Sequence, residues 1–305
     1  NGVGFVRAVL GAIKIVIGTA QAWLLVARIR PALLFLTGGW ATFPVALACW
    51  LRRIPIAIFL PDVEPALAIK LLSRLAYVVL ATTEESKRYF SDSTNVIATG
   101  YPLRSMILTA NREAAIAHFG LEGNRKTLLV WGGSRGARSL NETLSAILPD
   151  LLSDGLQVLH VSGELDWPAV QQRAASLADT LKVHYHAFAY LHDDMGMALA
   201  AADLTVSRAG ASILGEYPHF GLPSILVPYP FAWQYQKVNA DWLASRGAAV
   251  CVPDSELGKA LLPFVRTILG NAARLQDMHQ RTALLSHPEA ARDIARMLLK
   301  TTVGQ

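Results

Sequence analysis

The sequence predicts an α/β protein of two domains, each built around a doubly wound parallel sheet. The chain has 305 residues, which is long for a single typical domain. Of these residues 52% are hydrophobic and 17% are charged, enough apolar surface for two sizeable cores. Short apolar runs alternate with helical stretches along the whole chain, as expected when parallel strands are joined by crossover helices.

The candidate strands are short apolar runs, four in the first domain and six in the second. They cover residues 32–36, 56–60, 78–81, 95–98, 127–131, 158–161, 183–187, 204–207, 224–228 and 248–252. Gly100 and Pro102 end the fourth run, and a polar helical stretch leads to the fifth. We therefore place a linker near residues 105–125. The expected organisation is a first domain at 1–104, a second at 105–280, and a carboxyl-terminal helix at 281–305 that packs back toward the first domain.

The start of the chain differs from that of a typical doubly wound domain. Such a domain opens with a strand and a glycine-rich turn, whereas Gly2 and Gly4 here lead directly into a helical stretch. The first domain is therefore expected to be incomplete at its amino end. Phe5, Val9 and Ile13 recur at helical spacing, which predicts a helix that either lies on a membrane surface or packs against its own sheet.

Charge is distributed unevenly. Residues 1–104 contain 11 Lys and Arg against 5 Asp and Glu, whereas residues 105–305 contain 17 against 18. The basic first part predicts an anionic partner. Because its aromatic residues are not interleaved with the basic ones, an anionic membrane surface is favoured and nucleic acid is not expected. Cys49 and Cys251 lie far apart and predict reduced thiols, and no metal-ligand spacing is present, so no metal site is expected.

The most informative segment is 206–216, where a strand runs into a turn of small residues and then a helix. Gly210 permits close approach of a ligand to the backbone, and Ser212 is expected to begin the helix, whose amino end favours a phosphate. Glu216 lies about one turn into that helix and could accept hydrogen bonds from ribose hydroxyls. The segment therefore predicts a nucleotide-diphosphate site, although an ordinary strand-to-helix turn with a solvated Glu216 would have the same pattern.

A second loop follows the next predicted strand and contains two amide side chains. Gln236 and Asn239 are three residues apart and share one face if a helix begins there. Amides both donate and accept hydrogen bonds, so they suit the hydroxyls of a hexose. The alternative is a polar helix start capped by its own side chains.

Five motifs, in this order, resemble the MurG family of bacterial glycosyltransferases. They are residues 38–44, 100–104, 132–137, 207–216 and 236–240. The resemblance covers nearly the whole chain and implies a GT-B fold, in which two Rossmann-like domains face a cleft. It also implies inverting transfer of N-acetylglucosamine from UDP-N-acetylglucosamine to muramyl-pentapeptide pyrophosphoryl-undecaprenol in peptidoglycan synthesis, without a cofactor.

The resemblance assigns three residues to the nucleotide. Ser134 is expected to meet the donor diphosphate, and Arg104 to approach the nucleotide from the interdomain segment. The backbone at His192, together with that of its neighbour Leu191, is expected to read the uracil edge. Taken singly, Ser134 could be a helix cap, Arg104 a solvated linker charge and His192 a plain loop residue.

The remaining donor contacts follow from the last two motifs. The turn from Ala211 through Ser212 to Glu216 is expected to cradle phosphate and ribose, and Gln236 and Asn239 to hold the transferred sugar.

On the acceptor side, the glycine-rich loop implies Gly38, Gly39 and Thr42 as binding residues. The chain departs from the family in two places. The amino-terminal strand with its histidine-containing glycine loop has no counterpart, and residues 59–62 replace a His-Glu-Gln-Asn motif, with Asp62 in place of the Asn. We name Asp62 as the candidate catalytic base, with Glu64 as the alternative and a helix cap as the structural explanation.

The family implies peripheral attachment to the cytoplasmic face of the bacterial inner membrane. The expected partners are UDP-N-acetylglucosamine, the undecaprenyl-linked acceptor, the anionic membrane surface and other cell-wall enzymes. Three alternatives remain at this point: another lipid-directed glycosyltransferase, a UDP-sugar epimerase, or a fragment that binds UDP-sugar without catalysis.

Overall fold

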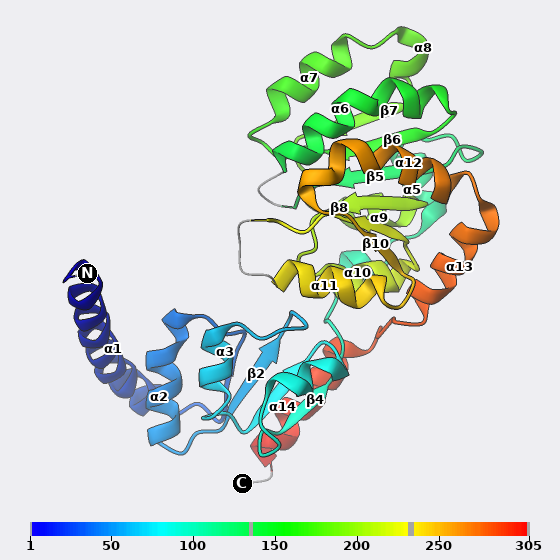
Figure 1. Ribbon diagram of the computed structural model, residues 1–305. Coiled ribbons are helices and arrows are strands. Elements are labelled where there is room, and N and C mark those ends of the chain that lie inside the picture. Colours follow the sequence, from blue (N-terminus) through cyan, green and yellow to red (C-terminus); the bar gives the residue numbers. More distant parts are fainter. Residues whose placement is uncertain (1, 134–136, 231–234, 304–305) are drawn as a thin grey trace. The chain divides into compact units, whose positions relative to one another are not determined.

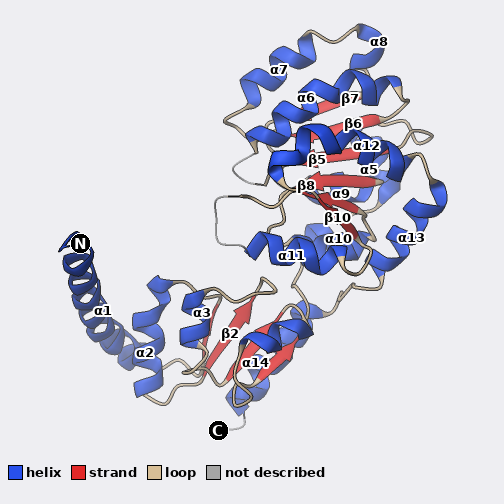
Figure 2. Ribbon diagram, in the orientation of Figure 1, coloured by secondary structure: helices blue, strands red, loops and turns tan. Residues whose placement is uncertain are grey.

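The computed structural model describes residues 2–133, 137–230 and 235–303. The chain divides into two compact units, which we call unit 1 (residues 1–101 and 289–305) and unit 2 (residues 102–288). Figures 1 and 2 show a parallel sheet with helices in each unit. The division falls three residues before the boundary expected at 104/105. The carboxyl-terminal segment that belongs to unit 1 begins at residue 289, eight residues later than expected.

Unit 1 contains a four-stranded parallel sheet with the order β1-β2-β3-β4. The strands therefore follow one another in chain order across the sheet. The elements of unit 1 are α1 (Gly2–Ile29), β1 (Leu34–Leu36), η1 (Trp40–Thr42), α2 (Phe43–Leu51), β2 (Ile56–Leu60), α3 (Leu67–Leu72), β3 (Val78–Ala81), η2 (Glu84–Tyr89), β4 (Val96–Ala98) and α14 (Ala290–Val303).

Both faces of this sheet are covered, because alternate residues of a strand point to opposite sides. Ile58 and Leu60 of β2 join a core with residues of α1, α2 and α3. Ala57 and Phe59 point the other way and pack with Ile294 of α14. Full burial of β2 on both faces explains why its sequence is a continuous apolar run.

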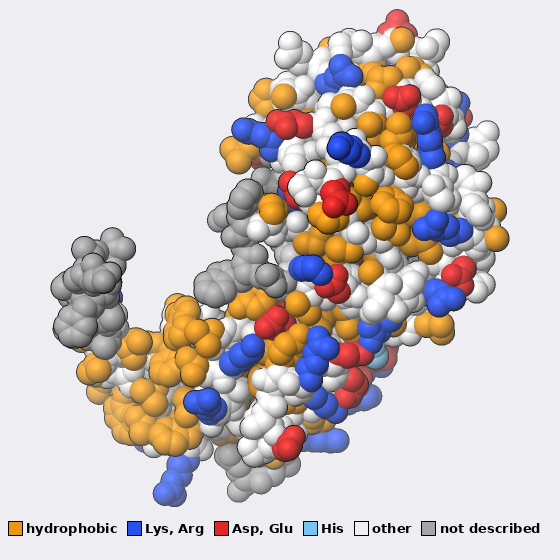
Figure 3. Space-filling view, in the orientation of Figure 1, with side chains coloured by type: hydrophobic (Ala, Val, Ile, Leu, Met, Phe, Trp, Pro, Cys, Tyr) orange, Lys and Arg blue, Asp and Glu red, His pale blue; other side chains and the backbone are white. Residues whose placement is uncertain are grey.

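The opening helix expected from the sequence is present as α1, which packs against α2. Ala22 and Val26 are buried, whereas Val16, Leu24 and Leu25 are exposed. One side of α1 thus packs against its own unit and another side stays open. Figure 3 shows hydrophobic side chains gathered over the part of unit 1 formed by α1 and α2. Among the residues that the structure describes, no helix is both long and apolar enough to cross a membrane.

Unit 2 contains a six-stranded parallel sheet with the order β10-β9-β8-β5-β6-β7. The elements of unit 2 are α4 (Ser105–Leu108), α5 (Arg112–Phe119), β5 (Thr127–Trp131), α6 (Arg138–Ser153), β6 (Gln157–Val161), α7 (Trp167–Ala175), α8 (Asp179–Lys182), β7 (Tyr185–Phe188), α9 (Met195–Ala201), β8 (Leu204–Ser207), α10 (Ile213–Phe220), β9 (Ser224–Leu226), α11 (Tyr235–Ala244), β10 (Ala249–Cys251), η3 (Asp254–Glu256), α12 (Leu257–Leu269) and α13 (Ala272–Ala283). All ten predicted strands are confirmed, with ends within two residues of those expected.

The segment expected as a linker, residues 105–125, is instead part of unit 2. It contains α4 and α5, which both pack against α9. Ile107, Ala115 and Phe119 are buried, and Gly196 of α9 allows the backbone at Met106 to come close, since a Cβ there would lie 2.4 Å from the Met106 carbonyl oxygen. Burial of these few apolar side chains holds a largely polar stretch against the unit.

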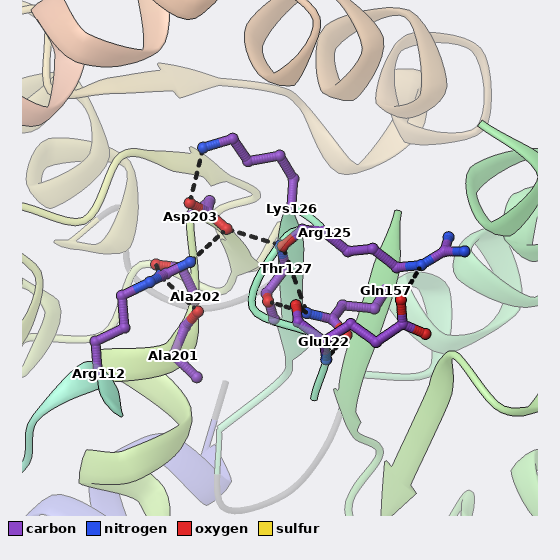
Figure 4. A network of polar contacts seen from close by, with 9 residues as sticks. All are labelled: Arg112, Glu122, Arg125, Lys126, Thr127, Gln157, Ala201, Ala202 and Asp203. Carbon is purple, nitrogen blue, oxygen red and sulfur yellow. Dashed lines mark hydrogen bonds and ion pairs between the residues drawn. The ribbon is translucent and has the colours of Figure 1, made fainter. Parts of the chain in front are cut away.

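A polar network connects the amino ends of three strands in unit 2 (Figure 4). The Asp203 carboxylate accepts hydrogen bonds from Arg112 Nη2 at 3.0 Å, Lys126 Nζ at 3.2 Å and the Thr127 backbone N–H at 2.8 Å. Gln157 Nε2 donates to Thr127 Oγ1 at 2.9 Å. These contacts join the starts of β5, β6 and β8, so the opposite edge of the sheet is left for ligand-binding loops.

Candidate functional site

The strand order of unit 2 locates a candidate binding site. From β5 the chain proceeds to β6 and β7 on one side, and from β8 to β9 and β10 on the other. Neighbouring strands whose connections run in opposite directions leave a crevice outside their carboxyl ends, where open α/β sheets bind ligands. Trp131 of β5 pairs with Ser207 of β8 as the last pair of this register. The segment that follows Trp131 and the loop 208–212 therefore both begin at the crevice.

The loop after β8 has the conformation expected from the sequence. Ser212 is the N-cap residue of α10, which begins at Ile213. The N–H groups of the first turn donate to the carbonyls of residues 210–212. The amino end of this eight-residue helix thus lies at the crevice, where the helix dipole favours an anion. A Cβ on Gly210 would meet no atom within 4 Å, so space is open beside this part of the backbone.

Glu216 is buried, with 5% of its surface exposed, and this excludes the solvated Glu216 considered in the sequence analysis. Its Oε2 accepts a hydrogen bond from the Ser212 hydroxyl at 3.0 Å. Burial raises the pKa of Glu216, while the hydrogen bond from Ser212 and the charge of Arg104 oppose that shift. A buried carboxylate one turn into the helix is suited to accept hydrogen bonds from vicinal hydroxyls.

Arg104 lies beside this carboxylate, with its Nη2 3.6 Å from Glu216 Oε1. Its side chain is 59% exposed, so the guanidinium can also reach an incoming anion. The structure therefore joins two residues that the sequence separates by more than a hundred positions.

The two amides of α11 both make contacts within unit 2. Gln236 Oε1 accepts a hydrogen bond from the Tyr229 backbone N–H at 2.9 Å, and Asn239 Nδ2 donates to the Ala209 carbonyl at 3.1 Å. Asn239 is fully buried. These contacts hold the loops after β9 and β8, respectively, and the sugar contacts expected of both amides stay predictions.

The loop that follows β7 contains the residues expected at the uracil. Leu191 is buried, whereas Tyr190 and His192 are exposed and their rings meet edge to face at 4.7 Å. Because β7 lies two strands from β5, this loop starts about 10 Å along the same edge of the sheet. The expected contact of this loop with the uracil edge stays a prediction.

The loop after β5 contains Gly133, whose φ of 83° favours glycine. Ser134, expected at the diphosphate, lies outside the described residues.

Arg208 is a residue at the crevice for which the sequence analysis assigned no role. Its guanidinium donates to Asp254 Oδ1 at 2.5 Å, Ser139 Oγ at 2.8 Å and the Val227 carbonyl at 3.1 Å. It thereby joins the ends of β8 and β9 to α6 and η3. The sequence signal for a role of Arg208 was its position directly after a strand, within segment 206–216. Its partners Asp254 and Ser139 could not be predicted, because they are 46 and 69 residues away in the chain.

In unit 1, the residues expected at the acceptor lie at the carboxyl edge of the sheet. Gly38 and Gly39 follow β1 with φ values of 95° and 97°, and a Cβ on Gly38 would lie 2.5 Å from Ile69 Cγ1. The Thr42 hydroxyl donates to the Gly39 carbonyl at 2.8 Å, which closes the turn. Only glycine fits the first position of this loop without strain.

Asp62 lies two residues after β2 and is half-buried. Since β1 and β2 are parallel neighbours, its loop adjoins the glycine loop after β1. The Thr82 hydroxyl donates to the Pro61 carbonyl at 2.8 Å and thus fixes this strand end. Glu64, the alternative base, pairs with Lys70 at 3.2 Å. The structure therefore brings Asp62 to the same edge as the expected acceptor loop.

Two α/β units with parallel sheets, one with a reversal of strand order, place the chain in the class of open-sheet α/β proteins that bind ligands at such a crevice. Residues 127–294 match the glycosyltransferase family 28 C-terminal domain. The chain is 40% identical to the UDP-N-acetylglucosamine--N-acetylmuramyl-(pentapeptide) pyrophosphoryl-undecaprenol N-acetylglucosamine transferase of Roseiflexus sp. (strain RS-1), over 94% of this chain and 73% of that protein. It is 38% identical to the protein of the same name from Desulforamulus reducens, over 93% of this chain and 77% of the relative.

Solved structures agree with this relationship. The crystal structure of Acinetobacter baumannii MurG superposes with a TM-score of 0.77 at 26% identity, covering 95% of this chain and 79% of that one. The UDP-GlcNAc 2-epimerase of Neisseria meningitidis bound to UDP-GlcNAc superposes with a TM-score of 0.67 at 14% identity, covering 94% and 81%, a likeness of fold alone. The chain belongs to the MurG family of UDP-N-acetylglucosamine-dependent glycosyltransferases and has its GT-B-like fold.

Proposed function

We propose that this protein transfers N-acetylglucosamine from UDP-N-acetylglucosamine to the lipid-linked muramyl-pentapeptide acceptor, with inversion at the anomeric carbon. The observation that carries the proposal is Glu216, buried at the crevice of unit 2 in a chain 40% identical to a relative named for this reaction. Family membership supplies the substrates, and the crevice supplies a site suited to the donor.

Groups of unit 2 are suited to stabilise the negative charge of the donor diphosphate. In the proposed step, the acceptor hydroxyl oxygen bonds to the anomeric carbon while the bond from that carbon to the diphosphate oxygen breaks. UDP leaves with the bonding electron pair. The helix amino end at Ser212 and the Arg104 guanidinium would stabilise the negative charge that develops on the diphosphate.

The acceptor hydroxyl must also lose a proton. Asp62 is proposed as the base that takes it, because it is a half-buried carboxylate at the same edge as the expected acceptor loop of Gly38, Gly39 and Thr42.

Unit 1 has the surface features of a peripheral membrane protein. Exposed apolar side chains of α1, α2 and η1 lie near basic residues of the same elements and their ends, among them Arg28, Arg30, Arg52 and Arg53. Arg52 lies over the Trp23 ring at 4.6 Å. Apolar side chains flanked by cations suit an anionic bilayer surface. We propose that unit 1 binds the cytoplasmic face of the membrane, where the lipid acceptor is reached.

Acceptor-dependent release of UDP tests the transferase proposal. The purified chain is incubated with UDP-N-acetylglucosamine and a short-chain lipid-linked muramyl-pentapeptide, and the disaccharide product is identified by mass spectrometry. Glu216→Ala should lose at least about tenfold in kcat/KM, while Glu122→Ala, on the surface at the opposite edge of unit 2, should match the native chain. Absence of the disaccharide product from the native chain would refute the transferase proposal. Formation of UDP-N-acetylmannosamine without acceptor would support the epimerase alternative.

Sedimentation with vesicles tests the membrane proposal. Binding to vesicles that contain phosphatidylglycerol should fall when Leu24 and Leu25 are both replaced by Glu, and should weaken at high salt. Leu165→Glu, which changes an exposed leucine of unit 2, serves as the control. Equal sedimentation of all three proteins would argue against attachment through α1.

A further inference from the structure

The buried hydroxyl of Tyr217 in α10 makes hydrogen-bond contacts with the ends of β5 and β8 in unit 2. Tyr217 belongs to α10 and has no exposed surface. Its oxygen lies 3.0 Å from Trp131 Nε1 and 2.6 Å from Ser207 Oγ. The indole N–H can only donate, and Ser207 Oγ donates to the Arg208 carbonyl at 3.0 Å. Trp131 therefore donates to Tyr217, whereas either hydroxyl can be the donor between Tyr217 and Ser207.

This point lies at the crevice where the strand order reverses. Trp131 and Ser207 are the last residues of β5 and β8 and are paired with each other in the sheet. Loop 208–212 begins at the residue that follows Ser207. On the helix, Tyr217 directly follows Glu216. One hydroxyl thus adjoins the ends of two strands at the crevice and the helix that contains Glu216.

Packing alone does not require this hydroxyl. The rings of Tyr217 and Trp131 meet edge to face with centroids 6.5 Å apart, a contact that phenylalanine would keep. A buried hydroxyl is costly without partners and directional when it has them. Burial raises the pKa of Tyr217 far above its usual range, so the hydroxyl stays protonated and remains a donor. Its hydrogen bonds therefore define where α10 lies along the ends of β5 and β8.

We propose that Tyr217 is a positioning residue of the donor site, whose hydroxyl sets the first turn of α10 against the ends of β5 and β8 and thereby places Glu216 for the ribose of the UDP-sugar. This inference rests on the proposed function, because it assigns a role within the same site. Tyr217 itself does not touch the donor. It acts through Glu216 and the backbone of loop 208–212.

Calorimetric titration of the full chain with UDP-N-acetylglucosamine tests the proposal. Tyr217→Phe should weaken donor binding about three- to tenfold, the range expected when one or two buried hydrogen bonds that hold a site are lost. Tyr185→Phe is the matched control, since the Tyr185 hydroxyl is also buried and bonds to His160 Nδ1 at 2.7 Å, but lies on β7. That variant should keep native affinity, although both variants lose a buried hydrogen bond.

A double-mutant cycle separates positioning from general destabilisation. If Tyr217 acts through Glu216, Tyr217→Phe should cause little further loss of affinity in a Glu216→Ala background. Trp131→Phe, which removes the donor to Tyr217 together with part of the indole ring, should shift affinity in the same direction and remains informative if Tyr217→Phe does not fold.

Each result has a separate meaning. Native affinity in Tyr217→Phe, equal losses in Tyr185→Phe, or additive losses in the cycle would each overturn the positioning role while leaving the donor site intact. A native chain that binds no UDP-N-acetylglucosamine would refute the proposed function itself.

Discussion

The Arg104 guanidinium lies 3.6 Å from Glu216 Oε1, while the Ser212 hydroxyl donates to Glu216 Oε2 at 3.0 Å. Both oxygens of a buried carboxylate are therefore oriented before any donor arrives. A carboxylate oxygen has a second lone pair, so each can still accept a hydrogen bond from a ribose hydroxyl. Such preorganisation reduces the ordering cost of binding.

Replacement of Arg104 should weaken donor binding less than replacement of Glu216. Arg104 is more than half exposed, so water screens its charge and Arg104→Ala should cost about three- to tenfold in affinity for UDP-N-acetylglucosamine. Glu216→Ala removes the acceptor of the ribose hydroxyls and should cost at least about tenfold. Calorimetry at two salt concentrations measures both, and the effect of Arg104 should shrink at high salt.

Arg125→Ala is the control for this experiment, because Arg125 pairs with Glu122 at 2.9 Å on the opposite edge of unit 2. A loss of donor affinity in Arg125→Ala as large as in Arg104→Ala would contradict a specific role for the Arg104 charge.

Donor affinity should depend on the ionisation of Glu216. Burial raises the pKa of Glu216, partly offset by Ser212 and Arg104, so the carboxylate takes up a proton at a higher pH than an ordinary glutamate. The ionised form is the better acceptor. Affinity should therefore rise with pH through the raised pKa and then level off. Calorimetry between about pH 5 and about pH 8 measures the profile. Glu216→Gln should remove the inflection, and an unchanged profile in that variant would assign it to another group.

Unit 2 should lose stability in mild acid because of His160. This residue is fully buried, and burial lowers its pKa from 6.5 to about 4. The unfolded chain therefore binds a proton below about pH 6.5 that the folded chain does not bind until about pH 4. This one group should lower the free energy of unfolding by about 2 kcal/mol between pH 7 and pH 5.

Urea denaturation at the two pH values measures the loss. His160→Gln lacks the titrating ring. Its free energy of unfolding should therefore fall by about 2 kcal/mol less than that of the native chain between pH 7 and pH 5. If His160→Gln and the native chain show the same pH dependence, the proposed contribution of His160 is wrong.

Alanine should destabilise the glycine loop of unit 1 more at Gly38 than at Gly39. Gly38 and Gly39 both have positive φ, so alanine at either should cost about 1–2 kcal/mol of backbone strain. Only at Gly38 would the new Cβ collide with Ile69, at 2.5 Å, whereas Gly39 has no atom within 4 Å. Gly38→Ala should therefore be less stable than Gly39→Ala by about 1–3 kcal/mol.

Thermal or urea unfolding of the two variants makes the comparison, and Ile69→Ala combined with Gly38→Ala should recover part of the extra loss. Equal stabilities of the two single variants would show that the loop moves to accommodate the clash.

Local sequence patterns predicted the strands well for a clear reason. A parallel strand buried on both faces, such as Ile56–Leu60, must be apolar at every position, and that signal is local. The helix start at Ser212 was also local, because small residues follow the strand there. The linker at 105–125 was wrongly predicted because α5 is polar overall and buries only a few side chains, which composition does not reveal.

Part of the local geometry of the candidate site could be predicted from the sequence. The turn at Ala211 and Ser212 and the presence of Glu216 could be read from one segment. The contacts of Gln236 and Asn239 with Tyr229 and Ala209 could not, since an amide that suits a sugar also suits a backbone group.

The sequence by itself determined the two-domain α/β class, all ten strands and the segment that contains Glu216, because each rests on residues close together in the chain. It also determined the family, through the order of five short motifs. Only the tertiary structure decided that β5 and β8 are neighbours, that Arg104 reaches Glu216, and that the Tyr217 hydroxyl joins Trp131 to Ser207. The physical reason is that these contacts depend on which strands pair and on how deeply side chains are buried. Hydrogen bonds and ion pairs between residues 10 to 112 positions apart leave no period or spacing in the sequence.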